Sequence, residues 1–359
     1  MNILFISHLS GKLSVGPCWS VPARIKAQAE MDNVYWLNWG NAELPHWLET
    51  GVFCKQNVGA VKLTNLPIPF NNPDIVIFEG FYSIKSARFA KQLLKNHIPY
   101  IINPRGSLTK QARSNESKWK KDLAHVIWFD KFIKNAASIQ YLTKQEAYDS
   151  IACNNRFFIL PNGFITPASK KMSFSKNNIN VIFIGRIDVY HKGLDLLLSA
   201  CRSVKDQLKA ANVHFKFFGP LNAGGDKFKQ MIADAGLSDQ MQLMGETTGS
   251  NKEQELLKAD VFVLTSRFEG HPMGLIEALA YGVPALVTEG TNMKEEIVNA
   301  NAGWGCSTNE NAVAKTLLQM IEEKSKFEEK SNCAYALAKN YNWPRLAEIF
   351  RERIKDVIR

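Results

Sequence analysis

The sequence lacks several patterns that would assign it to well-known classes of protein. No run approaches the ~20 consecutive apolar residues of a membrane-spanning helix, and no low-complexity segment or repeat at a period of about 20–50 residues is present. The six cysteines are widely scattered, with no CxxC pair and no Cys/His cluster at zinc-ligand spacing. We therefore expect a globular protein with free thiols in a reducing compartment.

Familiar phosphate-binding and targeting motifs are missing as well. The first apolar run, NILFIS at 2–7, is followed by HLSGKLSVG and not by GxGxxG, which argues against a nicotinamide-dependent enzyme. No Walker A spacing is found. The opening MNILFIS has neither a basic n-region nor a small-residue cleavage site, so we expect a first strand and not a signal peptide. Nucleic-acid binding is disfavoured because no recognition motif or aromatic platform accompanies the basic residues.

What the sequence has is enough length for two domains and an uneven charge. The chain has 359 residues and a net charge of +10. Residues 1–165 carry 19 Lys and Arg against 11 Asp and Glu, so the first half holds most of the basic excess. This excess either interacts with an anionic membrane or another polyanion, or consists of solvated lysines without a partner. Its densest cluster is Lys110, Arg113, Lys118, Trp119, Lys120 and Lys121.

Apolar β-prone runs alternate with helical periodicity along both halves of the chain. Such alternation predicts parallel strands with helices on both faces, an α/β class of fold. The polar stretch after RFFILPNGF (156–164) interrupts it, which predicts domains at 1–165 and 166–344 with a cleft between them. Strands are predicted at 2–7, 34–39, 75–80, 100–103, 138–143, 180–186, 215–219, 242–245, 261–264 and 285–288, and helices at 86–96, 194–208, 227–235, 252–258, 310–323 and 345–358.

The stretch TSRFEGHPMGLIEALAYGVP (265–284) carries two glutamates eight residues apart, Glu269 and Glu277. It follows the apolar run 261–264 and predicts a strand, an exposed loop and a short helix ending at Gly282. A helix entered from such a loop presents unpaired N–H groups, where a phosphate or diphosphate settles. The two carboxylates would then grip hydroxyls of a sugar-bearing ligand. The alternative is an ordinary strand-loop-helix unit with two solvated glutamates.

Two cations precede a helix in the same half of the chain. Arg186 and Lys192 lie in GRIDVYHKG, between the strand at 180–186 and the helix at 194–208. Taken alone, an Arg and a Lys in a loop are more often surface charges. Together with the glutamate loop they suit a diphosphate, above all one that develops charge as a leaving group.

These pieces resemble the donor domain of the retaining glycosyltransferases of family 4, the glycosyl transferases group 1. The resemblance rests on five segments in the family's order, and it extends to acceptor-domain features in NPRGSL (103–108), YLTKQE (141–146) and Gly16. It implies the GT-B fold, in which two Rossmann-like domains with parallel sheets face each other across a cleft. The helix at about 345–359 would pack back on the first domain. The five segments are PNG (161–163), GRIDVYHKG (185–193), FFGP (217–220), LMGE (243–246) and EGHPMGLIEALAYGVP (269–284).

The resemblance also implies roles for individual residues. Arg186 and Lys192 would bind the donor diphosphate, Glu277 the ribose, and Glu269 the transferred sugar. His271 would form a wall of the site, unless it simply packs in the interior. On the acceptor side, Arg105 and, more weakly, His8 would contribute. Further donor contacts would come from Gly16, from the N–H groups of Met273, Gly274 and Leu275, and from Gly245, Glu246 and Thr247 beside the base.

The activity implied is transfer of a sugar, with retention, from a UDP- or GDP-linked donor to a saccharide or polyisoprenyl-diphosphate-linked acceptor in bacterial surface polysaccharide assembly. No second carboxylate suits a double displacement, so the resemblance favours front-face attack. No DxD motif is present, so we expect metal independence and no cofactor. The basic cluster suggests docking on an anionic membrane, hence a cytoplasmic protein that is free or peripheral on the inner face of the plasma membrane. The alternatives are a nucleotide-sugar epimerase or phosphorylase of the same fold, and a non-catalytic sugar-nucleotide or polyanion binding protein.

Overall fold

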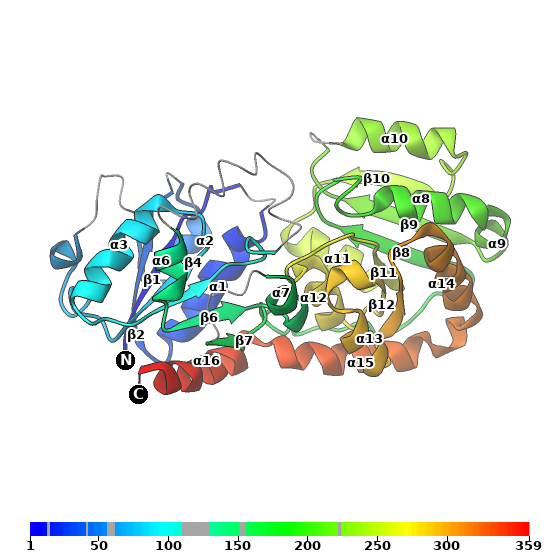
Figure 1. The fold of residues 1–359 in the computed structure, drawn as a ribbon. Coiled ribbons are helices and arrows are strands. Elements are labelled where there is room, and N and C mark those ends of the chain that lie inside the picture. The colour runs from blue at the N-terminus through cyan, green and yellow to red at the C-terminus, as the bar shows by residue number, and fades with distance from the viewer. Residues whose placement is uncertain are drawn as a thin grey trace. The chain divides into compact units, whose positions relative to one another are not determined.

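The computed structural model describes residues 1–12, 15–40, 42–55, 62–109, 129–150, 156–221 and 224–358 (Figure 1). The chain divides into two compact units. Unit 1 consists of Met1–Gly163 with Trp343–Arg359, and unit 2 of Phe164–Asn342. The predicted basic cluster at 110–121 lies outside the described residues, and membrane docking therefore remains a prediction from the sequence.

Unit 1 is built on a parallel sheet of seven described strands in the order β3-β2-β1-β4-β5-β6-β7. The strands are β1 (Asn2–Ser7), β2 (Asn33–Asn38), β3 (Phe53–Lys55), β4 (Ile75–Glu79), β5 (Tyr100–Asn103), β6 (Ser138–Tyr141) and β7 (Phe157–Ile159). The helices are α1 (Pro17–Ala29), α2 (Pro45–Leu48), α3 (Ile84–Lys95), α6 (Asp130–Lys134), α7 (Lys144–Asp149) and α16 (Trp343–Ile358), with a 3₁₀ turn η1 at Leu63–Asn65.

Alternate side chains of this sheet enter two separate cores, because successive residues of a strand point to opposite faces. Leu4, Ile6 and Phe78 pack with α3 and α6 on one face. Ile3 and Phe5 pack with α1 and α16 on the other face. The last helix, α16, therefore lies beside α1 (Figure 1). Burial on both faces explains the continuous apolar runs at 3–6 in β1 and 75–78 in β4.

Unit 2 is built on a six-stranded parallel sheet in the order β10-β9-β8-β11-β12-β13. This is the 3-2-1-4-5-6 order of doubly wound folds, whose ligands bind at the carboxyl ends of the strands where the order reverses. That point lies between β8 and β11. The strands are β8 (Ile179–Ile184), β9 (Val213–Phe218), β10 (Met241–Gly245), β11 (Val261–Leu264), β12 (Ala285–Thr288) and β13 (Gly303–Cys306).

Helices around this sheet enclose a single core. They are α8 (Leu194–Ser203), α9 (Lys205–Ala210), α10 (Gly225–Asp234), α11 (Gly249–Lys258), α12 (Met273–Ala280), α13 (Lys294–Asn299), α14 (Glu310–Glu322) and α15 (Phe327–Ala338), with 3₁₀ turns η3 (Glu289–Thr291), η4 (Lys324–Lys326) and η5 (Lys339–Tyr341). Within the described ranges, no helix combines the length and hydropathy needed to cross a membrane.

The predicted α/β class is confirmed, and every predicted strand is present with ends shifted by a residue or two. The helix predicted at 194–208 is wrong in one respect. Val204 leaves the helical region, with φ of −119° and ψ of 27°, and separates α8 from α9. The sequence analysis also missed α1, α15 and the short strands β3 and β13.

Phe350 tests the docking of α16 on unit 1. Its ring is 1% exposed and lies 4.1 Å from the guanidinium carbon of Arg24 on α1. We expect Phe350→Ala to lower the free energy of unfolding by about 3–5 kcal/mol, because it removes a buried ring and leaves a cavity. The neighbouring Ile349, 36% exposed, is the matched control, and Ile349→Ala should change it by about 0.5 kcal/mol or less. Equal effects in urea unfolding would contradict this packing.

Candidate active site

Two loops of unit 2 meet at the carboxyl ends of β8 and β11. The N–H of Arg267 donates to the carbonyl of His191 at 3.0 Å, and the hydroxyl of Thr265 donates to the carbonyl of Gly193 at 2.8 Å. The ring nitrogen Nε2 of His191 lies 2.8 Å from the carbonyl of Phe268. The loop that carries Arg186 and Lys192 is therefore fastened to the loop that carries Glu269.

Glycines allow the close approaches on which this arrangement depends. Gly193 has a φ of +60°, and a Cβ at this position would lie 1.9 Å from the carbonyl oxygen of Thr265. At Gly274, in the first turn of α12, a Cβ would lie 2.6 Å from the carbonyl oxygen of Ile184 at the end of β8. Any side chain at either position would push the loop or the helix away from the strand ends.

Lys192 and Glu269 form an ion pair across the two loops. The ammonium Nζ lies 2.5 Å from Oε1 of Glu269, and both side chains are largely buried, at 14% and 9% exposure. The hydroxyl of Ser266 donates to the same Oε1 at 2.6 Å, and Asn292 donates to the backbone carbonyl of Glu269. Within the described residues, all side-chain contacts of Glu269 use Oε1, which leaves Oε2 available.

Arg186 is linked to this pair through His191. Its side chain is 49% exposed, and Nη2 lies 3.2 Å from Nδ1 of His191. The imidazole stacks on the ring of Phe268 with the centroids 4.2 Å apart. Burial lowers the pKa of His191, and the nearby carboxylate of Glu269 opposes this effect. The lowered pKa favours the neutral imidazole.

The sequence analysis missed a second ion pair in these loops. Arg267 binds both carboxylate oxygens of Asp195 at 2.7 Å and donates to the carbonyl of Tyr190 at 2.6 Å. The bond to Asp195 raises the pKa of Arg267. A bidentate pair of this kind fixes the loop before α8. Arg267 and Asp195 lie 72 residues apart, so only the strand order relates them.

The helix α12 begins beside the end of β8. The N–H of Leu275 donates to the carbonyl of Pro272 at 3.2 Å, whereas those of Met273 and Gly274 have no acceptor among the described residues. Two of the three predicted N–H groups are therefore available. Glu277, one turn into the helix, forms an ion pair with Lys252 on α11.

The remaining predicted donor residues lie further from the ion pair. Gly245 ends β10 with a φ of +80°, and its carbonyl accepts the N–H of Gly219 at 2.8 Å. Glu246 is exposed and Thr247 half-buried, and neither contacts Lys192 or Glu269. This group lies at the carboxyl end of β10, which β9 separates from β8.

His271 lies in the interior of unit 2. Its side chain is 7% exposed, and the ring packs against Tyr341 with centroids 5.3 Å apart. Burial lowers the pKa of His271 to about 3. The geometry describes a packed neutral imidazole, the alternative that the sequence left open, and makes it unsuitable as a general base near pH 7.

The predicted residues of unit 1 are the acceptor-side residues His8 and Arg105 and the donor contact Gly16, and no contact among described residues joins them. His8 follows β1, and partial burial of its ring, followed by the charge of Lys85, lowers the pKa of His8. Gly16 caps the N-terminus of α1 with right-handed dihedral angles. Arg105 follows β5 with a left-handed φ of 52°.

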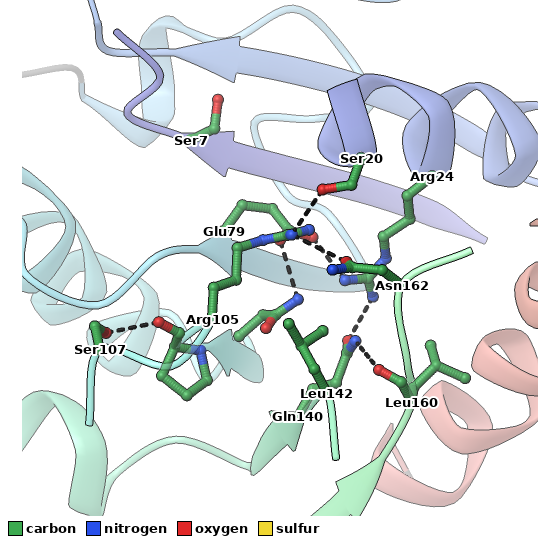
Figure 2. Close-up of polar contacts among 12 residues, drawn as sticks. Ser7, Ser20, Arg24, Glu79, Arg105, Ser107, Gln140, Leu142, Leu160 and Asn162 are labelled. Carbon is green, nitrogen blue, oxygen red and sulfur yellow. Dashed lines mark hydrogen bonds and ion pairs between the residues drawn. The ribbon is translucent and has the colours of Figure 1, made fainter. Parts of the chain in front are cut away.

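Arg105 belongs to a buried network that the sequence did not reveal (Figure 2). Its Nε donates to Oε2 of Glu79 at 2.7 Å, and Nη1 of Arg24 donates to Oε1 of the same carboxylate at 2.7 Å. Nη2 of Arg24 donates to Gln140 at 2.6 Å. Burial opposes the charge of Glu79, but Arg105 and then Arg24 outweigh it and lower the pKa of Glu79. The network joins α1 to the ends of β4, β5 and β6.

Two other features of the described residues bear on the assignment of the site. No group of three or more His, Cys, Asp or Glu side chains in these ranges is arranged to hold a metal ion. A cavity of about 480 Å³ in unit 2 is lined by Lys171 and Asp260 among others. It lies at the amino ends of β8 and β11, away from the predicted residues.

His271 gives the native state a pH dependence. Because its pKa is about 3 in the fold and about 6.5 in the unfolded chain, the unfolded state binds the extra proton between these values. The free energy of unfolding should therefore fall with decreasing pH, by about 1.4 kcal/mol per unit from this group. In urea unfolding, His271→Phe should reduce the slope of the free energy of unfolding against pH by about 1.4 kcal/mol per pH unit, the contribution of one proton. Its effect at pH 7.5 measures packing alone, and an unchanged slope would contradict the buried neutral ring.

Comparison with known proteins places these observations in a family. The model of the family "Glycosyl transferases group 1" matches residues 165–339. The chain is 33% identical over 119 residues to the amylovoran biosynthesis glycosyltransferase AmsK of Erwinia amylovora, covering 32% of this chain and 28% of that protein. It is 28% identical over 149 residues to the colanic acid biosynthesis glycosyltransferase WcaL of Escherichia coli K12, assigned there as putative, covering 40% and 35%. These matches span about a third of each relative's length.

Solved structures are similar over nearly the whole chain. Sucrose-phosphate synthase from Thermosynechococcus elongatus gives a TM-score of 0.76 at 15% identity, covering 99% of this chain and 98% of that one. HepE from Anabaena, in complex with UDP and glucose, gives 0.75 at 16% identity, covering 99% and 100%. These likenesses show the predicted GT-B fold of two Rossmann-like domains. Residues 165–339, which make up most of unit 2, match the glycosyl transferases group 1 family.

Proposed function

We propose that the protein is a retaining glycosyltransferase, which moves a sugar from a nucleoside diphosphate sugar to an acceptor hydroxyl. The observation that carries this proposal is the buried pair of Lys192 and Glu269 beside the exposed Arg186, at the strand ends where doubly wound domains bind ligands. A cation pair and a carboxylate in one place suit a ligand that has both phosphates and sugar hydroxyls.

The diphosphate binds to Arg186 and Lys192. Arg186 is exposed and, among the described residues, has no carboxylate closer than the 4.0 Å contact with Asp188, so it can form a bidentate contact with phosphate oxygens. Lys192 reaches the second phosphate by exchanging part of its interaction with Glu269. The free N–H groups of Met273 and Gly274 at the start of α12 add donors for the distal phosphate.

The sugar and the ribose bind to the two glutamates. Oε2 of Glu269 accepts hydroxyls of the transferred sugar, while Lys192 and Ser266 hold Oε1. Glu277 accepts ribose hydroxyls, a role in which Lys252 on α11 orients the carboxylate. Gly245, Glu246 and Thr247 border the base, Gly16 contributes from unit 1, and His271 supports the loop from inside.

The reaction proceeds by attack on the same face that the diphosphate leaves. The leaving diphosphate takes the proton of the acceptor hydroxyl, so no side chain has to act as a base. Arg186 and Lys192 stabilise the charge that develops on the leaving group, and the rest of the site orients the reactants. With two cations in this role the reaction needs no divalent metal.

Relatives support a role in bacterial surface polysaccharide assembly. The named relatives act in amylovoran biosynthesis and, by a putative assignment, in colanic acid biosynthesis, and HepE was solved with UDP and glucose. We therefore propose a UDP-linked donor, with GDP as the second candidate, and a saccharide or lipid-linked acceptor that unit 1 recognises through Arg105 and His8. A nucleotide-sugar epimerase would need no acceptor, and a non-catalytic binding protein would release no nucleotide.

Titration of UDP by calorimetry, in buffer with a chelator, tests the donor site. We expect Lys192→Ala to weaken UDP binding by about tenfold to a hundredfold, the cost of losing a charge-assisted contact of about 1.5–3 kcal/mol. Lys216→Ala is the matched control, because Lys216 is a half-exposed lysine on β9 of unit 2 that pairs with Glu255 on α11. Equal affinities for the two variants would reject the assigned site, and a requirement for magnesium would reject metal independence.

A further inference from the structure

The guanidinium of Arg105 is incompletely paired inside unit 1. Its side chain is 8% exposed. Nε donates to Glu79, and Nη1 donates to the hydroxyl of Ser20 at 3.0 Å and to Oδ1 of Asn162 at 3.1 Å (Figure 2). Nη2 is buried and has no acceptor among the described residues. Leaving a buried donor of a charged group unpaired costs about 1–3 kcal/mol or more. The unpaired Nη2 of Arg105 therefore requires an explanation.

The surrounding residues hold this guanidinium firmly in place. Glu79 is fixed by Arg24, which donates to Oε1, and by Asn103, whose amide donates to Oε2 at 3.1 Å. The backbone is fixed as well, since Glu146 accepts the N–H of Gly106 at 2.5 Å and that of Leu142 at 2.6 Å. Arg105 keeps its left-handed φ of 52° under these constraints. Side chain and backbone are thus both preorganised.

The Nη1 side of the guanidinium faces the start of α1, and the adjacent Nη2 is the unpaired donor. Ser20, which accepts from Nη1, lies in the first turns of this 13-residue helix, and no side chain caps its N-terminus. A helix N-terminus and the Nη1–Nη2 edge of an arginine both favour anions, and this edge matches the two oxygens of a phosphate or carboxylate. Asn162, the other acceptor of Nη1, is a neutral partner that an anion can displace.

We propose that the Nη1–Nη2 edge of Arg105 binds an anionic group of the acceptor, a phosphate or a carboxylate, so that the acceptor substrates of this enzyme are anionic. This inference rests on the proposed function and specifies its acceptor. The Ser20 hydroxyl, whose oxygen accepts from Arg105, donates its own hydrogen to the anion. Glu79 keeps Nε and acts as a positioning residue, and the buried Arg24 acts through Glu79.

Anion-dependent thermal stability tests the proposal without knowledge of the full acceptor. The background variant Arg186→Ala/Lys192→Ala removes the donor-side cations of unit 2. In this background, inorganic phosphate should raise the melting temperature above that in sodium chloride of equal ionic strength. Arg105→Lys in the same background should weaken the phosphate response by about tenfold in midpoint concentration, because a lysine keeps the charge but not the fork.

The controls separate a binding role from a structural one. Ser20→Ala, which leaves the contact between Arg105 and Glu79 intact, should weaken the phosphate response by about threefold to tenfold, the effect of one lost hydrogen bond. It keeps the test valid if Arg105→Lys does not fold. A lower melting temperature with an unchanged phosphate response in both variants would show a structural role and overturn the proposal.

Two further arms identify the anion and separate this proposal from the donor assignment. Glucuronate is tested with glucose as its neutral control. A response to glucuronate but not to phosphate indicates a uronic acid acceptor. A response to phosphate but not to glucuronate indicates a phosphorylated acceptor. A response to neither overturns the proposal. UDP titration of the chain with intact Arg186 and Lys192 should be unaffected by Arg105→Lys. If the unmodified protein does not bind UDP, this result rejects the proposed donor site but not the anion site.

Discussion

The ion pair between Lys192 and Glu269 is the interaction on which the candidate site depends. It joins residues 77 positions apart across the loops after β8 and β11, and both partners are largely buried. Removal of one partner of a buried pair leaves an uncompensated charge and costs about 3–5 kcal/mol. A ligand with a phosphate beside a sugar satisfies both charges at once, because it brings an anion for the ammonium and hydroxyls for the carboxylate. The arrangement therefore favours ligands that carry both groups.

Both units are built on a parallel sheet, but the arginines at their strand ends differ in burial. In unit 2, the guanidinium of Arg186 is half-exposed at the strand ends, where it can meet a mobile ligand. In unit 1, Arg24 and Arg105 are buried around Glu79. Burial, opposed by Glu79 and assisted by Arg105, lowers the pKa of Arg24 to about 10. Unit 2 thus exposes the charge of Arg186 to solvent, whereas in unit 1 the buried charges of Arg24 and Glu79 position one edge of Arg105.

Much of the fold could be predicted from the sequence, because strands buried on both faces are continuously apolar, as 75–78 and 261–264 show. Lys192 and Glu269 could be named from their motifs, although only the order β8-β11 shows that they touch. Glu79 could not be found, since it ends an apolar run and its partner Arg24 lies 55 residues away. His191 lies inside a recognised motif, but its role could not be predicted because its contact with Phe268 is tertiary. Short strands such as β13, GWGC, lack a β-branched pattern.

The central claim is that Lys192 binds the phosphates and Glu269 binds the sugar. The most direct measurement compares the affinities of Glu269→Gln for UDP and for UDP-glucose by calorimetry, because this change removes the charge and keeps the size. The account predicts that UDP affinity stays within about threefold or increases, since Lys192 is released, while the affinity for UDP-glucose falls by about tenfold or more relative to UDP. An equal loss for both ligands would contradict the account.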